Sequence, residues 1–246
     1  MQPTDDHFGE QVAATYDESA AAMFAPSVVD PAVDFLAEAA GAGPALEFGV
    51  GTGRIALPLA ARGVRVHGID SAPAMVARLR AKPGGDTVGA TVGDFASTAL
   101  DSRFSLVYSV FNTIMNVTTQ AGQVACFRNA AAHLRPGGRF VVEVMMPELR
   151  RLEPGGSTVL FRTGSSKWAY DDYDIATQTM NSNYIEVVEG RGSYRSVPFR
   201  YVWPAELDLM AEIAGLRLSE RWGGWTREPF TSDSRGHVSV WEKPRS

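Results

Sequence analysis

The sequence has one cysteine, Cys126, among its 246 residues, so it cannot form an intrachain disulfide. Disulfide-stabilised secreted folds are therefore excluded, and the composition fits a reducing compartment such as the cytoplasm. Val124 and Phe127 lie near Cys126 on an apolar helix face. Because no activating group is nearby, this pattern favours a small buried core thiol over a nucleophile.

Long apolar runs are also missing. No stretch approaches the roughly 20 consecutive apolar residues that a transmembrane helix needs. The first ten residues, MQPTDDHFGE, are polar and acidic, where a secretory signal would be basic and then apolar. We therefore expect a cytoplasmic protein with no membrane partner.

Positive charge is in deficit, since 23 Lys and Arg stand against 28 Asp and Glu, for a net charge of -5. This balance gives no general attraction to nucleic-acid phosphates, so a nucleic-acid partner is not expected. Histidine is scarce, and the four copies are scattered, at positions 7, 67, 133 and 237. None pairs with a nearby carboxylate in the sequence, so no metal site is expected.

Hydrophobic residues make up 45% of the chain, which is ample for one large packed domain. From residue 45 onward, short apolar runs alternate with amphipathic helical segments, a pattern typical of an α/β fold with a parallel sheet. Residues 8–40 are predicted to be helical, with breaks at Pro26 and Pro31. The segment 134–138 is predicted to end a helix and turn into the fifth strand. The five predicted strands are 45–48, 64–69, 87–92, 104–111 and 139–145, with helices at 55–61 and 73–81.

The helical period disappears between residues 148 and 203, where β-rich segments at 158–162, 180–188 and 194–202 predict an inserted antiparallel sheet with a turn at 189–192. A helical pattern through Leu207 and Ile213 then ends at Gly215, and strands are predicted at 216–221 and 237–241. We therefore divide the chain into a helical lid (1–30), a core (31–147), an antiparallel β insertion (148–203) and a C-terminal helix and strands that complete the core sheet (204–246).

Residues 46–54, Leu-Glu-Phe-Gly-Val-Gly-Thr-Gly-Arg, leave the first strand, turn sharply and open a helix. Alternate glycines let the backbone approach a ligand closely, and the helix that follows offers free N–H groups. The second strand ends at Asp70, whose carboxylate could accept hydrogen bonds from ribose hydroxyls or cap the next helix. The third strand ends in Gly93-Asp94-Phe95, which offers a carboxylate and an aromatic face to an adenine. Three strand ends thus converge on one adenosine.

In order and spacing, Glu47-x-Gly49-x-Gly51-x-Gly53, Asp70, Gly93-Asp94-Phe95 and the segment 134–138 resemble the motifs of class I S-adenosylmethionine (SAM)-dependent methyltransferases, over residues 30–147. The resemblance implies a doubly wound, Rossmann-like seven-stranded sheet with SAM as cofactor. The β insertion is similar to that of the small-molecule branch, which includes amino-sugar N-methyltransferases and other natural-product tailoring enzymes. The acceptor would then be a small molecule of secondary metabolism, with the insertion covering its site.

The resemblance also assigns roles to the cofactor site. Glu47 would face the methionine portion of SAM, Asp70 would hold the ribose, and Asp94 would hold the adenine. Val110 would pass close to the sulfonium, and Met75 would be an apolar wall for the adenine or a core residue. The expected cofactor-binding residues are Glu47, Gly49, Gly51, Gly53, Asp70, Ser71, Met75, Asp94, Phe95 and Val110.

Methyl transfer from a sulfonium is an in-line displacement, so the protein must align the reactants and exclude water. If the acceptor carries a proton, a base is needed, and His237 at the start of the last strand is the expected histidine. Tyr16 resembles lid tyrosines that close over the cofactor, and we expect it to take part in catalysis. Asn112 is expected to orient the acceptor or to cap the next helix. The other expected acceptor-binding residues, from the insertion, are Trp168, Tyr184, Arg200 and Tyr201.

Two other classes of function fit parts of the sequence. Residues 51–56 satisfy the G-x-G-x-x-A pattern of NAD(P)-dependent oxidoreductases, but counting from Gly49 places Arg54 where a small residue must pack. A non-catalytic SAM-binding protein would keep the same glycines. The residues do not determine whether oxygen, nitrogen or carbon is methylated, whether a base is used, or the oligomeric state.

Overall fold

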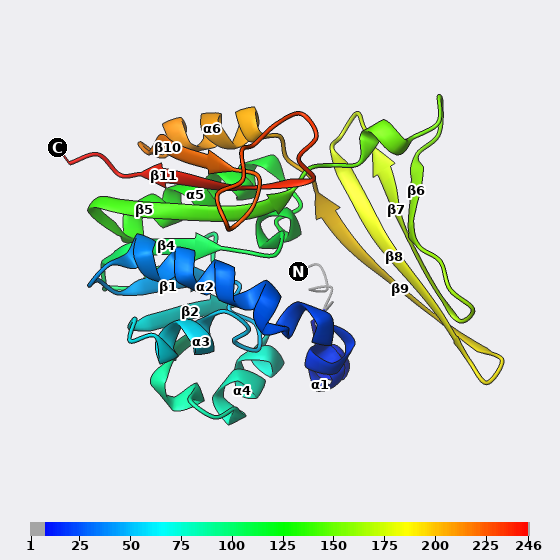
Figure 1. Cartoon of the computed structure of the whole chain (residues 1–246), viewed down its shortest axis with the longest axis horizontal. Coiled ribbons are helices and arrows are strands. Elements are labelled where there is room, and N and C mark those ends of the chain that lie inside the picture. Colours follow the sequence, from blue (N-terminus) through cyan, green and yellow to red (C-terminus); the bar gives the residue numbers. More distant parts are fainter. Residues whose placement is uncertain (1–7, 246) are drawn as a thin grey trace.

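A seven-stranded sheet forms the centre of the protein in the computed structural model, which describes residues 8–245 (Figure 1). Its strands lie in the order β10 (Arg217–Trp222), β11 (Gly236–Glu242), β5 (Leu134–Met145), β4 (Phe104–Ser109), β1 (Ala45–Phe48), β2 (Val66–Asp70) and β3 (Gly89–Val92). The strands from β5 to β3 are parallel, and β11 is antiparallel to both of its neighbours. The predicted doubly wound α/β sheet is confirmed, and the strand order reverses between β1 and β4, where such sheets bind ligands.

Helices cover both faces of this sheet, because successive side chains of a strand point to opposite sides. Leu46 and Phe48 of β1 belong to a core that includes α5 (Gln120–His133) and α6 (Pro204–Ile213). Ala45 belongs to a second core, with α2 (Pro26–Ala40) and α3 (Ala56–Ala61). The remaining helices are α1 (Glu10–Ser19), α4 (Pro73–Ala81) and the short 3-10 helices η1 (Ala21–Phe24), η2 (Gly85–Thr87), η3 (Thr113–Asn116) and η4 (Leu149–Arg151).

Two predicted boundaries are wrong. The second helix begins at Pro26 and continues through Pro31, which lies inside α2. The apolar face of α2, which includes Val33 and Leu36, is buried against the sheet, and this burial offsets the backbone hydrogen bond that Pro31 cannot donate. The fifth strand begins at Leu134 instead of at residue 139, and the predicted turn lies within it: Gly137 has a φ of +75°, and the pairing with β4 shifts register between Leu134 and Arg139.

The insertion forms a separate antiparallel sheet in the order β6 (Thr158–Arg162), β7 (Lys167–Asp174), β8 (Thr179–Val188) and β9 (Arg191–Arg200). The sequence did not predict β7, whose three aspartates are unfavourable in strands; pairing on both edges overrides that preference. The predicted turn at 189–192 is shorter, with only Glu189 and Gly190 between the strands. Both have positive φ, +51° and +76°, as a two-residue type I′ hairpin requires.

One face of the insertion sheet meets the core. Cross-strand pairing puts Met180 opposite Tyr173, and both belong to the core that contains α5 and α6. Tyr184 lies four residues after Met180 and is paired with Arg195, so both share this inner face. Figure 1 shows the sheet standing beside the core, on the side toward which β4 points.

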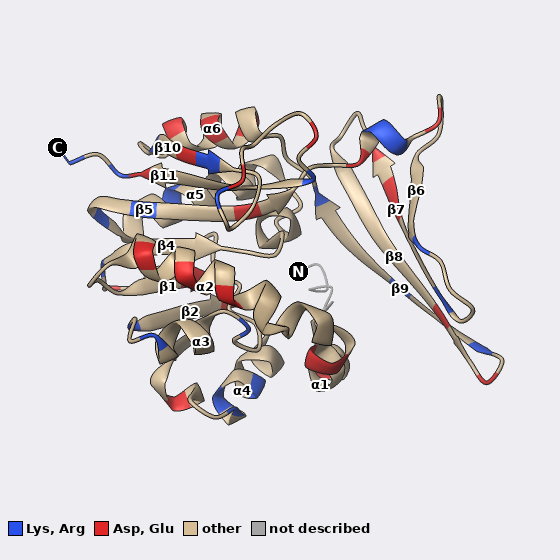
Figure 2. Ribbon diagram, in the orientation of Figure 1, with Lys and Arg blue, Asp and Glu red and all other residues tan. Residues whose placement is uncertain are grey.

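Charges of both signs are spread over the elements visible in Figure 2, with acidic residues along α2 and basic residues on α4. Within residues 8–245, no helix combines the length and the apolar character needed to cross a membrane.

Candidate functional site

The glycine turn after β1 takes a backbone conformation that only glycine adopts readily. Gly49, Gly51 and Gly53 have φ angles of +76°, +53° and +85°. A Cβ on Gly49 would lie 2.4 Å from Cγ2 of Thr113, and one on Gly53 would lie 2.9 Å from Cδ1 of Leu79. The space beside Gly51 is open within 4 Å. Packing therefore requires the outer two glycines, and the middle one leaves the backbone accessible to a ligand such as a nucleoside.

Asp70, at the end of β2, ties this turn to α4. Its Oδ2 accepts a hydrogen bond from the Gly51 N–H at 2.8 Å, and its Oδ1 accepts one from the Ala72 N–H at 2.9 Å. Burial raises the pKa of Asp70, and these two hydrogen bonds oppose the shift. Both functions considered for Asp70 are thus compatible, because the carboxylate supports the start of α4 and faces the turn. Ser71 is exposed beside it and does not cap α4.

A cavity opens at the carboxyl ends of β1 and β4. It brings together five of the predicted residues, Tyr16, Glu47, Gly49, Gly51 and Val110. Gly53, Asp70, Ser71, Met75, Asp94 and Phe95 are not in its lining. Its other lining residues are Val50, Thr52, Arg54, Ile55, Phe111 and Thr113.

Within the part of the chain that the structure describes, Glu47 is the only carboxylate lining this cavity, and it is almost completely buried. Its Oε2 accepts a hydrogen bond from the Tyr108 hydroxyl at 2.9 Å. Burial raises the pKa of Glu47 to about 8, while the hydrogen bond from Tyr108 and the charge of Arg54 oppose that shift. This shift favours the neutral form of Glu47, and an ammonium group in the cavity would favour the carboxylate.

Helix α1 closes over the glycine turn. Oδ1 of Asp17 accepts a hydrogen bond from the Thr52 hydroxyl at 2.6 Å, and Asp17 also forms an ion pair with Lys82. Tyr16 enters the cavity from the same helix. Met75 is buried beneath α1 with Ala13, which fits the core position that the sequence left open, and its contact with an adenine stays a prediction.

The turn after β4 is strained. Phe111 and Asn112 both have positive φ, +57° and +61°, which costs free energy for residues other than glycine. Two contacts with β5 hold the turn: Oε2 of Glu143 accepts from the Phe111 N–H at 2.8 Å, and Oδ1 of Asn112 accepts from the Met145 N–H at 2.6 Å. Asn112 therefore uses its amide oxygen within the protein, and its side chain does not cap η3. The orientation of an acceptor by its amide NH2 group stays a prediction.

Sequence reasoning missed Arg54 and Phe111 as partners. The Arg54 guanidinium lies 4.6 Å from the centre of the Phe111 ring, and both residues line the cavity. Sequence reasoning also missed Glu143. In addition to holding the Phe111 N–H, this carboxylate accepts a hydrogen bond at Oε1 from Nε1 of Trp225 at 3.0 Å. Only the asparagine at position 112 gave a signal in the sequence, because asparagine tolerates positive φ after a strand.

The two residues predicted to contact the adenine at the end of β3, Asp94 and Phe95, lie in different environments. Phe95 is buried in the core and stacks on Phe48, with ring centres 5.6 Å apart, so its ring is not offered to a purine. Asp94 is exposed, and its Oδ1 accepts a hydrogen bond from the Ala96 N–H at 2.8 Å. The aromatic residue after a strand end was expected to face the ligand, but the hydrophobic core takes it up.

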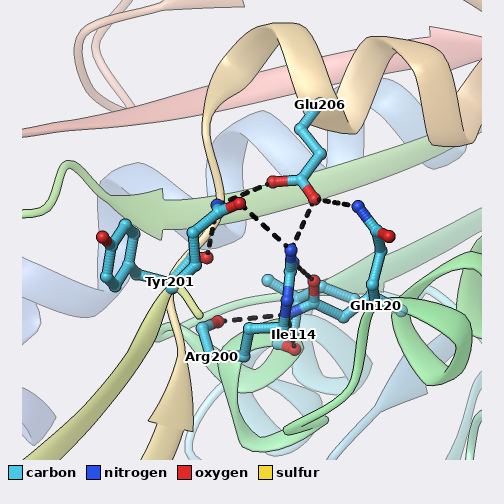
Figure 3. Close-up of polar contacts among 7 residues, drawn as sticks. Ile114, Gln120, Arg200, Tyr201 and Glu206 are labelled. Atoms are coloured by element: carbon cyan, nitrogen blue, oxygen red, sulfur yellow. Dashed lines mark hydrogen bonds and ion pairs between the residues drawn. The ribbon is translucent and has the colours of Figure 1, made fainter. Parts of the chain in front are cut away.

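Arg200 and Tyr201 do not face an acceptor site. Arg200 donates from Nη1 to Oε1 of Gln123 at 2.6 Å and from Nη2 to Oε1 of Glu206 at 2.7 Å (Figure 3). The Tyr201 ring is buried in the core, 5.8 Å from that of Tyr173. These residues join the end of β9 to α5 and α6, which corrects the prediction that they bind the acceptor.

Tyr184 is the one predicted acceptor-binding residue that lies on the inner face of the insertion. Trp168 is paired with Ile185, the neighbour of Tyr184, so it lies on the opposite, outer face. The Arg195 guanidinium stacks on Tyr184, 4.5 Å from the ring centre, and sequence reasoning missed it. Burial raises the pKa of Tyr16, and the charges of Arg54 and Arg195 oppose this, so Arg195 lies within electrostatic range of the lid tyrosine.

His237 is enclosed where β11 begins. Its Nδ1 lies 2.8 Å from Oγ of Ser239, and its Nε2 has no hydrogen-bond partner among the described residues. Burial and the nearby Arg221 lower the pKa of His237 to about 4, which makes it a weak base. It does not line the cavity, so its position does not support the predicted catalytic role. Within residues 8–245, no three His, Cys, Asp or Glu side chains are grouped to hold a metal ion.

Comparisons with known proteins agree with this geometry. Residues 45–138, from β1 into β5, match the family described as a methyltransferase domain. The structure of the CcbJ methyltransferase from Streptomyces caelestis is 39% identical, covers 97% of this chain and 98% of its own, and superposes with a TM-score of 0.85. The cypemycin N-terminal methyltransferase of a Streptomyces species is 29% identical over 242 residues, which are 94% of this chain and 98% of that protein.

A third relative shares the fold at lower identity. The SAM-bound structure of CalS10, an amino pentose methyltransferase from Micromonospora echinaspora, is 23% identical, with a TM-score of 0.67 over 88% of this chain and 90% of its own.

Proposed function

The chain belongs to the class I SAM-dependent methyltransferases of the natural-product type, and we propose that it methylates a nitrogen of a small-molecule intermediate held between the cavity and the inner face of the insertion sheet. The observation that carries this proposal is the meeting of Glu47, Gly51, Tyr16 and Val110 in one cavity at the switch point of the sheet.

The residues of the cavity fit the cofactor. The bound cofactor supplies the methyl group as a sulfonium. We assign the binding of its α-ammonium group to Glu47, because an ammonium group favours the charged form of this buried carboxyl. The Gly51 backbone and the Asp70 carboxylate would hold the sugar, and the exposed Asp94 carboxylate remains a proposed contact for the adenine amino group. Tyr16 and α1 would exclude water from the reacting atoms.

Among residues 8–245, bases are scarce at the cavity, and this favours nitrogen as the acceptor atom. Glu47 is committed to the cofactor, His237 lies elsewhere, and the pKa of Tyr16 is raised above the usual range of a phenol. A hydroxyl acceptor needs a base in the transition state, whereas an amine can lose its proton to water before it attacks. The name of the cypemycin relative, an N-terminal methyltransferase, also supports nitrogen.

Methyl-labelled SAM tests this proposal with paired acceptors. The pairs are natural-product intermediates that differ only in carrying an amine or a hydroxyl, for example amino sugars and their hydroxy analogues. We expect label on the amine members and none on their partners. S-Adenosylhomocysteine (SAH) should stabilise the protein by about 2.7 kcal/mol at 100 times its dissociation constant, and NAD and NADP should not. Label on hydroxyl members alone would contradict the nitrogen assignment.

The acceptor wall gives a further prediction. The Arg195 guanidinium stacks on Tyr184 on the inner face, and its charge acts on Tyr16, which lines the cavity with Phe111. This aromatic and cationic pair would suit an acceptor that carries an anionic or electron-rich group. Arg195→Gln should lower kcat/KM for the acceptor roughly tenfold, mainly through KM, while the affinity for SAH stays unchanged.

Arg191→Gln is the matched control, because Arg191 begins the same strand beside the hairpin turn. Arg191→Gln should leave kcat/KM for the acceptor and the affinity for SAH near the wild-type values. If Arg195→Gln changed SAH affinity as much as acceptor KM, Arg195 would belong to the cofactor site and the acceptor would be held elsewhere.

A further inference from the structure

Tyr108 and Glu47 are neighbours across two parallel strands. The register of β1 and β4 puts Glu47 beside Tyr108, so the phenol reaches the carboxyl directly, at 2.9 Å. Both residues are buried, and Tyr108 packs among the apolar residues under α2 and α3. This packing alone does not assign Tyr108 a role in the reaction. Its hydroxyl, however, donates its hydrogen bond to the carboxyl group of Glu47 in the cavity.

The other charged and titratable groups around Glu47 come from three elements. Arg54, in the glycine turn, favours the charged carboxylate, and Asp70, at the end of β2, disfavours it. Tyr16 lines the same cavity from α1, and its own pKa is raised by burial. Of the side chains that favour ionised Glu47, Tyr108 is the one that touches it, as a hydrogen-bond donor.

We propose that Tyr108 is a positioning residue that holds Glu47 toward the cofactor's α-ammonium group, and that cofactor binding releases a proton from Glu47 to solvent. The inference rests on the proposed function of this cavity. The balance is simple: a neutral carboxylic acid meets an ammonium group, the carboxylate–ammonium pair forms, and one proton leaves. No covalent bond changes other than the O–H bond of Glu47.

The proton can be counted by isothermal titration calorimetry of SAH in buffers of different ionisation enthalpy. Because burial raises the pKa of Glu47 to about 8, binding at pH 7 should release close to one proton. The comparison ligand is 5′-methylthioadenosine, which keeps the nucleoside and the sulfur but lacks the amino-acid portion. It should bind without releasing a proton.

The role of Tyr108 is tested by Tyr108→Phe, which removes the donor and keeps the ring. The hydrogen bond favours ionised Glu47, so its loss should raise the pKa of Glu47 further and weaken SAH binding at pH 7 roughly tenfold. The deficit should shrink as the pH rises above the pKa of Glu47, because the carboxyl then becomes ionised without ligand, first in wild type and next in the variant. A purely structural defect would weaken binding equally at every pH. Tyr173→Phe, which also removes a buried hydroxyl, serves as control and should match wild type.

The outcomes separate this inference from the function on which it rests. If wild-type protein bound neither ligand, the proposed cofactor site would be wrong. If SAH bound without proton release, or released as many protons as 5′-methylthioadenosine, the site would stand and the coupling to Glu47 would be refuted. If Tyr108→Phe failed to fold, the proton count on the wild type would still decide the coupling. A pH-independent loss of affinity in a folded Tyr108→Phe would refute the positioning role.

Discussion

Replacing Arg200 with alanine should lower the free energy of unfolding by about 3–5 kcal/mol, because the substitution leaves the carboxylate of Glu206 in a largely buried site without its cation. The side chains of Arg200 and Glu206 are only 7% and 15% exposed, so water cannot replace the lost partner well. Gln123 also loses the donor to its amide oxygen. Urea denaturation of both proteins at neutral pH measures the difference.

The pH dependence of this effect identifies its cause. Burial alone would raise the pKa of Glu206, but hydrogen bonds from Arg200, Gln178 and Gln120 lower it below the ordinary value of 4.5. A carboxyl with a lowered folded-state pKa contributes stability above its unfolded pKa and loses that contribution as the pH falls through the folded value. The difference in the free energy of unfolding between wild type and Arg200→Ala should therefore become smaller below about pH 4.5.

A double variant provides the control. Replacing Arg200 and Glu206 together with methionine removes both charges and keeps most of the volume, so it should recover much of the stability lost in Arg200→Ala. If Arg200→Ala unfolded at the same urea concentration as wild type, the network at the end of β9 would not contribute measurably to stability.

Asp70→Ala should weaken the affinity for SAH by about 1.5–3 kcal/mol, because we propose that this carboxylate accepts charge-assisted hydrogen bonds from the sugar. It also frees the Gly51 N–H that the carboxylate holds, so the glycine turn is less ordered when the ligand arrives. Calorimetric titration with SAH measures the loss. The melting temperature without ligand shows whether the domain remains folded.

Asp70→Asn separates the two contributions. The amide keeps one acceptor oxygen for a backbone N–H but carries no charge, so its affinity for SAH should fall between those of wild type and Asp70→Ala. Equal affinity in all three proteins would mean that the ribose is held by other groups.

Much of the core fold could be predicted from the sequence because buried parallel strands have simple signals. The apolar run 45–48 predicts a strand, and the glycines after it predict a turn, without reference to the rest of the chain. Pro31 misled the prediction, since local propensity favours a break there and tertiary burial of α2 outweighs it. In the insertion, β7 was missed because its aspartates carry no strand signal until β6 and β8 pair with it.

In the candidate site, too, the features set by a local motif could be predicted, and the contacts made by tertiary packing could not. The position of Glu47, Gly49 and Gly51 at the cavity could be predicted, because the motif itself fixes where the backbone turns and which side chain precedes it. The buried network of Arg200 and the outer position of Trp168 could not be predicted, since alternation along a strand gives two faces but does not say which one meets the core. Arg54 with Phe111, and Tyr184 with Arg195, are contacts between residues that only the folded chain brings together.

Glu143 makes the turn beside the cavity depend on a distant part of the chain. One of its oxygens holds the Phe111 N–H, and the other holds the indole of Trp225, in the segment between β10 and β11. A chimera that took this C-terminal segment from another methyltransferase would lose the indole donor unless it kept an equivalent at position 225. The carboxylate would then be free to change rotamer and release the strained Phe111–Asn112 pair. Exchange of C-terminal modules between relatives is therefore constrained by this one carboxylate.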